Sequence, residues 1–453
     1  MLAVSQRGAR TRPPAGKGSR GRSQLDRWLQ SRWQKTASRV PGLPRRSPHV
    51  LYRSVYTDLG EYGREARAML LALLVAGYTV RSVGPTPGAG WGVRVGFDER
   101  TVRRLTLLHL PVARQPRLEI GHVRADTYMP VVPGAYRIGR VMFETDRLPG
   151  GWVDVCRQLD QVWVPSRFNL ETFRGAGVEP HKLRVIPVGV DTGVFRPDAP
   201  PALIAGAAGF KFLSAFAWQQ RSGWPFLIEG FVREFSAGDG VCLVIQLLPG
   251  SPGLHAVRRQ LNGFIDSLGI PREKLPPIIV EKERGSPQEL AGVYASCNAF
   301  VLPTRGEAWG FPFLEAMASG LPVIGTRWGG HLDFMDDGNA RLIDVEELEV
   351  IGPDVESAHL YAGHRWARPS VAHLRRLMRE VVGDRKGAAA LGARARRDVE
   401  RQWDVRATSR RFLAEMARSV RAISRPPGMP GRAPDGKPEK TPREDDPGGR
   451  SDT

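Results

Sequence analysis

The sequence predicts an α/β fold with two Rossmann-like domains that face a cleft, and three observations support this prediction. Short apolar runs alternate with helical stretches along the middle of the chain, which is typical of βαβ units. A proline-rich segment at 195–201 divides these units into two series. The length of 453 residues and the hydrophobic fraction of 41% suit about two or three packed domains.

The first series precedes the proline-rich segment and predicts the N-terminal domain. It opens with a possible strand at 50–55 and an apolar run at 69–76, which is too short to span a membrane and is interpreted as a buried helix. The pattern then predicts strands at 134–143, 161–164 and 183–188, with helices at 151–159 and 166–176.

The second series follows the proline-rich segment and predicts the C-terminal domain. Its strands are expected at 210–216, 241–246, 278–281 and 299–302, and its helices at 224–235, 256–268 and 287–296. Ligands of such sheets bind beyond the carboxyl ends of the strands. The loops that follow the strands are therefore expected to carry the functional site.

The two ends of the chain differ in composition from its middle. Residues 1–48 are rich in Arg, Gly, Pro and Ser and are predicted to form a basic, mostly disordered arm, while residues 425–453 are predicted to form a disordered tail. Between these ends we place an N-terminal domain at 49–197, a C-terminal domain at 198–385 and C-terminal helices at 386–424.

The net charge of +19 is concentrated in two regions of the chain. Residues 1–50 carry 12 Arg or Lys against one acid, and residues 364–425 carry 17 against 6, so each region has a net charge of +11. Residues 51–363 are nearly neutral, at −2. Basic regions suit anionic membrane surfaces or nucleic acid. No nucleic-acid-binding motif accompanies the charge, so solvated arginine-rich ends are the simpler interpretation.

The sequence also bears on the compartment of the protein. No run of roughly 18 apolar residues and no secretory signal is apparent. Cys156, Cys242 and Cys297 lie far apart and lack the spacing of metal ligands. We therefore expect a cytoplasmic protein with buried, reduced thiols, able to associate peripherally with the inner face of a membrane.

Two glutamates, Glu307 and Glu315, bracket an apolar segment after the last strand of the second series. A helix should begin near Gly310 with Pro312 in its first turn, where the missing amide proton costs little. The N-terminus of a helix attracts phosphate. Carboxylates on either side of such an anion site would suit a sugar diphosphate, because each can accept hydrogen bonds from neighbouring hydroxyls.

The Glu307–Glu315 segment resembles the E-x7-E motif of the retaining GT-B glycosyltransferases, the glycosyltransferase group 1 (GT4-like) family. The resemblance extends over about residues 51–424 and includes an N-terminal glycine loop at 60–64, an interdomain strand and loop at 162–169 and 184–191, a strand and glycine loop at 321–330, and branch motifs at 142–149 and 366–369. It implies a GT-B fold, in which the helix near 406–423 crosses back to the N-terminal domain. The N-terminal domain would then bind the acceptor and the C-terminal domain the donor.

The resemblance also implies roles for particular residues. Glu315 is expected to bind the ribose hydroxyls of a nucleotide sugar, and Glu307 to hold the donor sugar and stabilise charge at its anomeric carbon. Gly310 and Phe311 are expected to offer their backbone to the diphosphate. The remaining candidates are Trp309, Arg221 and Ser222 on the donor side, and Gly60, Tyr62, Gly63 and His109 on the acceptor side.

This chain departs from the family pattern at two places. The family usually has a Lys where this chain has Ser222, and often an Arg where it has Phe216, so Arg221 is the cation left in this segment. Glu144 stands where many members carry a catalytic-site His, and we take it as the second catalytic candidate. His109 is an alternative on the N-terminal side, although a buried structural histidine explains it better.

The sequence therefore predicts a retaining, metal-independent glycosyltransferase that moves a sugar from a nucleotide-sugar donor to a carbohydrate, lipid-linked or small-molecule acceptor. The central body lacks a plausible DxD metal motif, and no cofactor is expected. One alternative is a catalytically inactive GT-B binding protein, motivated by Ser222 and Phe216. Another is a nucleic-acid-binding protein that uses the arginine-rich ends. A dehydrogenase is disfavoured because Gly60-x-x-Gly63 lacks the third glycine of a dinucleotide fingerprint.

Overall fold

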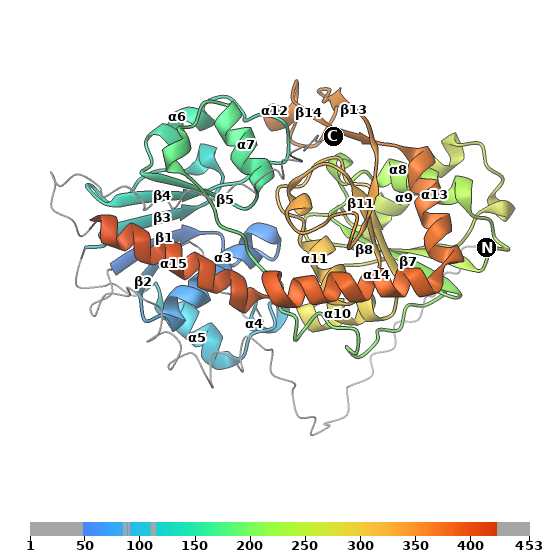
Figure 1. Cartoon of the computed structure of the whole chain (residues 1–453), viewed down its shortest axis with the longest axis horizontal. Helices are drawn as coiled ribbons and strands as arrows, with labels where there is room; N and C mark the ends of the chain where they lie inside the picture. Colours follow the sequence, from blue (N-terminus) through green and yellow to red (C-terminus); the bar gives the residue numbers. More distant parts are fainter. Residues whose placement is uncertain (1–48, 85–87, 89–90, 110–114, 424–453) are drawn as a thin grey trace, which may run out of the picture.

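A computed structural model describes residues 49–84, 88, 91–109 and 115–423. The predicted arm at 1–48 and tail at 425–453 lie outside the described residues. The described chain forms two lobes side by side, each built around a parallel sheet (Figure 1). The prediction of two α/β domains is confirmed.

The N-terminal lobe contains a six-stranded parallel sheet in the order β2-β1-β3-β4-β5-β6. Its core strands are rich in apolar residues because helices cover both faces of such a sheet. The strands are β1 (His49–Ser54), β2 (Thr79–Val83), β3 (Leu118–His122), β4 (Tyr136–Arg140), β5 (Gln161–Val164) and β6 (Leu183–Val185). The helices are α3 (Glu61–Val75), α4 (Trp91–Arg94), α5 (Glu99–Leu107), α6 (Trp152–Arg157) and α7 (Arg167–Gly175).

The C-terminal lobe repeats this architecture with the strand order β12-β11-β10-β7-β8-β9. Every residue of β8 is buried, as expected for a central strand of a doubly covered sheet. The strands are β7 (Phe210–Phe216), β8 (Val241–Leu247), β9 (Ile278–Glu281), β10 (Ala299–Leu302), β11 (Val323–Thr326) and β12 (Arg341–Ile343). The helices are α8 (Trp224–Glu234), α9 (Leu254–Ser267), α10 (Pro287–Ala295), α11 (Phe311–Ala318) and α13 (Val371–Gly383).

The segment between β12 and α13 extends from the C-terminal lobe and contacts the N-terminal lobe. It consists of the antiparallel strands β13 (Val345–Val350) and β14 (Arg365–Pro369) with the short helix α12 (Ala358–Tyr361) between them. Leu360 of α12 is buried in a core cluster made otherwise of residues from the N-terminal lobe. We call residues 345–369 the bridging hairpin, because they belong to the C-terminal lobe by sequence while α12 packs on the N-terminal lobe (Figure 1).

The C-terminal helices return to the N-terminal lobe, which confirms that prediction. After α14 (Arg385–Asp398) and a short π-helical turn (Val399–Trp403), α15 (Val405–Ile423) packs against α3 (Figure 1). Thr408 accepts a hydrogen bond from the Gly189 amide at 2.9 Å, and Ser419 donates one to Gln161 at 3.1 Å. These contacts fix α15 to the segment that joins the two lobes and to β5.

Two predicted strands are longer than the observed ones. The predicted strand at 134–143 is shortened to β4, because the side-chain amide of Asn169 pairs with both backbone groups of Phe143, at 3.0 and 2.6 Å, in place of a strand partner. The predicted strand at 183–188 is shortened to β6, since Pro187 has no amide proton to donate to a neighbouring strand. None of the described helices is both long and apolar enough to cross a membrane.

Candidate active site

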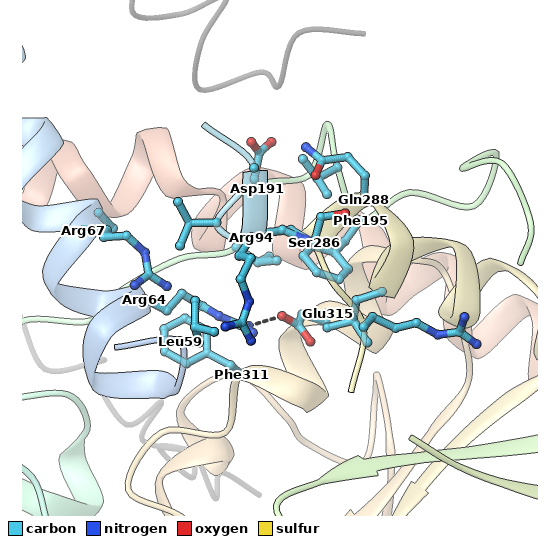
Figure 2. Close-up of a pocket in the computed structure, with 18 of the residues that line it drawn as sticks. Leu59, Arg64, Arg67, Arg94, Asp191, Phe195, Ser286, Gln288, Phe311 and Glu315 are labelled. Carbon is cyan, nitrogen blue, oxygen red and sulfur yellow. Dashed lines mark hydrogen bonds and ion pairs between the residues drawn. The ribbon is translucent and has the colours of Figure 1, made fainter. Parts of the chain in front are cut away.

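A pocket of about 170 Å³ lies between the two lobes, lined by residues that follow strands of both sheets, such as Leu59 after β1 and Phe311 after β10 (Figure 2). The N-terminal lobe contributes Leu59, Arg64 and Arg67 to its wall, and the C-terminal lobe contributes Phe311 and Glu315. This position, beyond the carboxyl ends of parallel strands, is where α/β folds bind ligands.

Glu315 lies in α11 and is fully buried, with both carboxylate oxygens engaged. Arg64 of α3 donates to Oε1 across the cleft (Figure 2). The Tyr294 hydroxyl donates to Oε2 at 2.9 Å. Burial raises the pKa of Glu315, while Arg64 and Tyr294 oppose that shift. A buried carboxylate whose partners come from both lobes is placed to hold a ligand between them.

The start of α11 is set by Gly310, as the sequence predicts. Gly310 has φ +96°, and a Cβ there would lie 2.9 Å from the Phe313 ring, so a larger residue would be strained at this position. Pro312 occupies the first turn of α11, and Phe311 lines the pocket. The N-terminus of α11 therefore points toward the cleft.

Glu307 lies in the loop between β10 and α11, against Arg221. The Arg221 Nη1 atom is 3.3 Å from Glu307 Oε1 and donates to the Gly306 carbonyl at 2.6 Å. Burial raises the pKa of Glu307, and Arg221 opposes that shift. The guanidinium of Arg221 therefore sits beside the first glutamate of the motif and offsets part of its charge.

Glu144 approaches this loop from the N-terminal lobe. A Cβ on Gly306 would lie 2.2 Å from the Glu144 carbonyl, so glycine is required for the two lobes to come this close. The Glu144 Oε2 atom accepts a hydrogen bond of 3.1 Å from Tyr361, a residue of the bridging hairpin. The structure thus brings Glu144 and Glu307 to the same junction, with Tyr361 as an additional member.

Glu61 also lies in this region, although it was not predicted as a site residue. Burial is the main cause that raises the pKa of Glu61 to about 8, and the negative charge of the nearby Glu307 adds to this shift. Arg64 was not predicted either, although both residues lie in the glycine-loop segment at 60–64. Glu61 and Arg64 are three positions apart, and residues at this spacing share one face of a helix. That spacing could have identified them as a pair facing the cleft.

The glycine loop before α3 is shaped by close backbone contacts. A Cβ on Gly63 would lie 2.0 Å from the Asp58 carbonyl, and the Gly60 amide donates to the Asp58 side chain at 2.6 Å. The Tyr62 hydroxyl donates to the Met142 carbonyl at 3.5 Å, just before Glu144 in sequence. Gly60 therefore caps α3, with Tyr62 and Gly63 in its first turn, and the acceptor-side role of these three residues stays a prediction.

Three other candidates use their polar groups elsewhere. The indole of Trp309 donates to the Val188 carbonyl at 2.9 Å and packs against Trp403, in the region joining the lobes. Ser222 is buried and donates to the Ala217 carbonyl at 2.7 Å. His109 contacts the Tyr56 hydroxyl at 2.7 Å, and burial lowers its pKa. Their roles toward a ligand stay predictions.

A buried polar cluster lies between α3 and the sheet of the N-terminal lobe. Glu65 of α3 accepts from Arg140 at the end of β4 and is paired with His122 at the end of β3, at 3.1 Å. The Tyr52 hydroxyl lies 2.8 Å from the other nitrogen of His122. Burial opposes ionisation of Glu65, but Arg140 and His122 outweigh it and lower the pKa of Glu65 to about 2. This Glu65 cluster ties α3 to the sheet.

The family model described as "Glycosyl transferases group 1" matches residues 271–351, which include both motif glutamates. The chain is 25% identical over 196 residues to a D-inositol 3-phosphate glycosyltransferase of Acidothermus cellulolyticus, covering 41% of this chain and 42% of the relative. The chain spans less than half the length of the first curated relatives it matches. The predicted resemblance to the glycosyltransferase group 1 family is confirmed.

Solved structures show that the fold is shared with GT-B glycosyltransferases. A sucrose-phosphate synthase from Thermosynechococcus elongatus superposes with a TM-score of 0.59 at 15% identity, over 83% of this chain and 100% of that chain. Anabaena HepE, solved in complex with UDP-glucose, superposes with a TM-score of 0.56 at 14% identity, over 82% of this chain and 100% of that chain. The predicted fold class is confirmed.

Proposed function

We propose that this protein is a glycosyltransferase that moves a sugar from a nucleotide-sugar donor to a hydroxyl acceptor, with retention of configuration and without a metal ion. The observation that carries the proposal is that Glu315 lines the pocket between two Rossmann-like lobes, while Glu307 and Glu144 lie close together where the same lobes meet. The family resemblance supports the reaction class, and the UDP-glucose complex of Anabaena HepE supports a nucleotide sugar as donor.

The donor is proposed to lie along α11. Glu315 would accept hydrogen bonds from the ribose hydroxyls, and the diphosphate would face the N-terminus of α11 at Gly310 and Phe311, where amide groups and the helix dipole favour negative charge. The sugar would then extend toward Glu307 and Arg221, which lie at the junction with the N-terminal lobe. Glu144 and Tyr361 would face the acceptor at that junction.

The transfer breaks the bond between the anomeric carbon and the diphosphate oxygen and forms a bond from that carbon to the acceptor oxygen. Positive charge develops on the sugar ring and negative charge on the leaving diphosphate. Glu307 would stabilise the first charge, while Arg221 and the amides of α11 would stabilise the second. The proton of the acceptor hydroxyl would leave with the released diphosphate or pass to Glu144, which balances the reaction.

Cations of the protein are proposed to take the place of a metal ion. Arg221 and Arg64 both reach the cleft from opposite lobes. Within residues 49–84, 88, 91–109 and 115–423, no group of three or more His, Cys, Asp and Glu is arranged to hold a metal. Activity that persists in excess chelator would support this part of the proposal, and activity restored only by added Mg²⁺ or Mn²⁺ would contradict it.

The proposal is tested by incubating the protein with sugar derivatives of UDP, GDP and ADP and measuring transfer or slow hydrolysis. A catalytically inactive binding protein would bind one of them without releasing sugar. The Glu315→Ala variant should bind the donor at least tenfold more weakly, since losing a charge-assisted hydrogen bond costs on the order of 1.5–3 kcal/mol. Glu229→Ala, which removes a partly exposed glutamate of α8 outside the cleft, is the matched control. Equal donor affinity in wild type and Glu315→Ala would remove Glu315 from the site.

The acceptor is proposed to be a carbohydrate or a lipid-linked molecule at an anionic membrane surface. The support is a set of exposed arginines in the C-terminal helical region: Arg394, Arg397, Arg401, Arg410, Arg411, Arg418 and Arg421. Each basic residue near an anionic surface contributes roughly 1 kcal/mol at most. Flotation with anionic and neutral liposomes tests the idea, and equal recovery with both at moderate salt would contradict it.

A further inference from the structure

The contact between Arg64 and Glu315 places a cation of the N-terminal lobe on the carboxylate that we assign to the ribose. Arg64 donates to Glu315 Oε1, and its guanidinium lies 5.2 Å from the centre of the Phe311 ring in the first turn of α11 (Figure 2). We propose that Arg64 is a ligand of the donor diphosphate, and that it pairs with Glu315 only while the donor is absent. This inference rests on the proposed function.

Glu315 is not accessible to a ribose while Arg64 stays in place. Glu315 has 0% of its surface exposed, and its two covering partners differ in their own exposure. Tyr294 is fully buried, whereas the Arg64 side chain is 31% exposed and lines the pocket. A ribose that reaches Glu315 must therefore displace Arg64, because Arg64 is the partner with room to move.

The displaced guanidinium has a short path to the diphosphate position. The backbone of Arg64 is held in α3, next to Gly63, which packs closely against the Asp58 carbonyl. Its guanidinium already lies beside Phe311, at the end of α11 where the diphosphate is proposed to sit. A rotation of the side chain would be sufficient, with no movement of the helix.

The charges on the donor side leave a role for such a cation. Arg221 is shared between Glu307 and the Gly306 carbonyl, so its charge is already partly offset. Ser222, at the position of the family's usual lysine, brings no charge and uses its hydroxyl on Ala217. A guanidinium can bind a phosphate through two parallel hydrogen bonds, which a hydroxyl cannot do.

The proposed exchange of Glu315 for the diphosphate keeps Arg64 paired with a negative charge both before and after the donor binds. An unpaired charge in a partly buried cleft is unfavourable. In the empty cleft Arg64 neutralises Glu315, and with the donor bound it would neutralise the diphosphate while the ribose hydroxyls satisfy Glu315. Arg64 therefore competes with the nucleoside part of the donor and assists the diphosphate part, so its removal should affect the two parts in opposite directions.

Isothermal titration of Arg64→Met with a nucleoside diphosphate and with the matching nucleoside tests this inference. UDP, GDP and ADP are first titrated into the wild type to choose the base. In Arg64→Met, we expect affinity for the diphosphate to fall about tenfold, as for the loss of a charge-assisted contact, and affinity for the nucleoside to stay level or rise. Arg64→Lys should retain part of the diphosphate affinity, since lysine acts as a point charge.

Arg233→Met is the matched control, because Arg233 forms a 2.8 Å ion pair with Glu229 on α8, outside the cleft. It should change neither affinity. If Arg64→Met weakens both ligands equally, Arg64 only supports the fold of the site and the inference is wrong, while the proposed function stands. If the wild type binds none of the three diphosphates, the proposed function fails, and this inference fails with it.

Discussion

Tyr361 donates a 3.1 Å hydrogen bond to Glu144 and thereby joins the bridging hairpin of the C-terminal lobe to the candidate catalytic loop of the N-terminal lobe. The Tyr361 ring also stacks on Phe143 at 5.2 Å. The same hairpin contacts the loop of Glu307, because the Ala367 amide donates to the Arg305 carbonyl at 2.8 Å. The bridging hairpin therefore contacts the loop of Glu144 and the loop of Glu307 and holds the two loops together.

We expect Tyr361→Phe to lower the rate of sugar transfer by about tenfold, because a hydrogen bond to a charged group contributes roughly 1.5–3 kcal/mol. The phenylalanine ring keeps the stacking on Phe143, so the stability of the protein should change little. The measurement is kcat for transfer or donor hydrolysis, with thermal unfolding as the check on stability. Tyr78→Phe is the control, since the buried Tyr78 hydroxyl makes no hydrogen bond within the described residues. An unchanged kcat in Tyr361→Phe would mean that Glu144 is not oriented by the hairpin.

Much of the fold was predictable from local sequence, and the strands of the C-terminal lobe show why. The observed bounds of β7 and β10 agree with the predicted runs at 210–216 and 299–302. Both strands are almost wholly buried in the sheet, so most of their residues are apolar and their ends are clear. The motif between Glu307 and Glu315 was equally clear, because Gly310 and Pro312 mark a helix start by their backbone chemistry alone.

The contacts that complete the candidate site were not predictable in this way. Arg64 and Glu315 are 251 positions apart, and Tyr361 and Glu144 are 217 apart, so no periodicity links them. Within the bridging hairpin, the sequence analysis identified only the branch motif at 366–369 and predicted no strand or helix. The direction of a loop side chain is also set by its surroundings. Trp309 lies between the two motif glutamates in sequence, yet its indole donates to the segment that joins the lobes.

The Glu65 cluster provides a prediction about stability. Glu65→Gln should lower the free energy of unfolding at pH 7 by about 3 kcal/mol, because it leaves the buried Arg140 without a charged partner. The shift of the pKa of Glu65 from 4.5 to about 2 corresponds to a stabilisation of the same order. Urea-induced unfolding of the two proteins measures the difference.

The pH dependence of this difference follows from the direction of the shift. The pKa of Glu65 is lower in the folded state, so its stabilising effect is present above pH 4.5 and is lost as the pH falls toward 2. The gap between wild type and Glu65→Gln should thus be constant near neutral pH and shrink in acid. Glu229→Gln, at an exposed ion pair, should cost less than 1 kcal/mol. A gap for Glu65→Gln as small as that of the control would show that the cluster does not hold α3.

The last prediction concerns Arg221, whose guanidinium lies between Glu307 and the Gly306 carbonyl. Arg221→Gln removes the cation while the backbone contact of Arg221 with the Arg305 amide, at 2.9 Å, can persist. Affinity for a nucleoside diphosphate should fall about tenfold, with a smaller effect on the nucleoside. The diphosphate affinity of Arg221→Lys should lie between those of the wild type and Arg221→Gln, since a lysine keeps the charge without the two parallel hydrogen bonds of a guanidinium.

The same variant should change the pH profile of transfer. Burial raises the pKa of Glu307 and Arg221 opposes that shift, so removing Arg221 should raise the pKa further. Glu307 is proposed to act in its ionised form, which is populated only above its pKa. The acid limb of the kcat profile should therefore move to higher pH in Arg221→Gln, and part of the lost activity should return as the pH is raised. A profile that falls uniformly without moving would indicate that Arg221 acts on the diphosphate alone and leaves the ionisation of Glu307 unaffected.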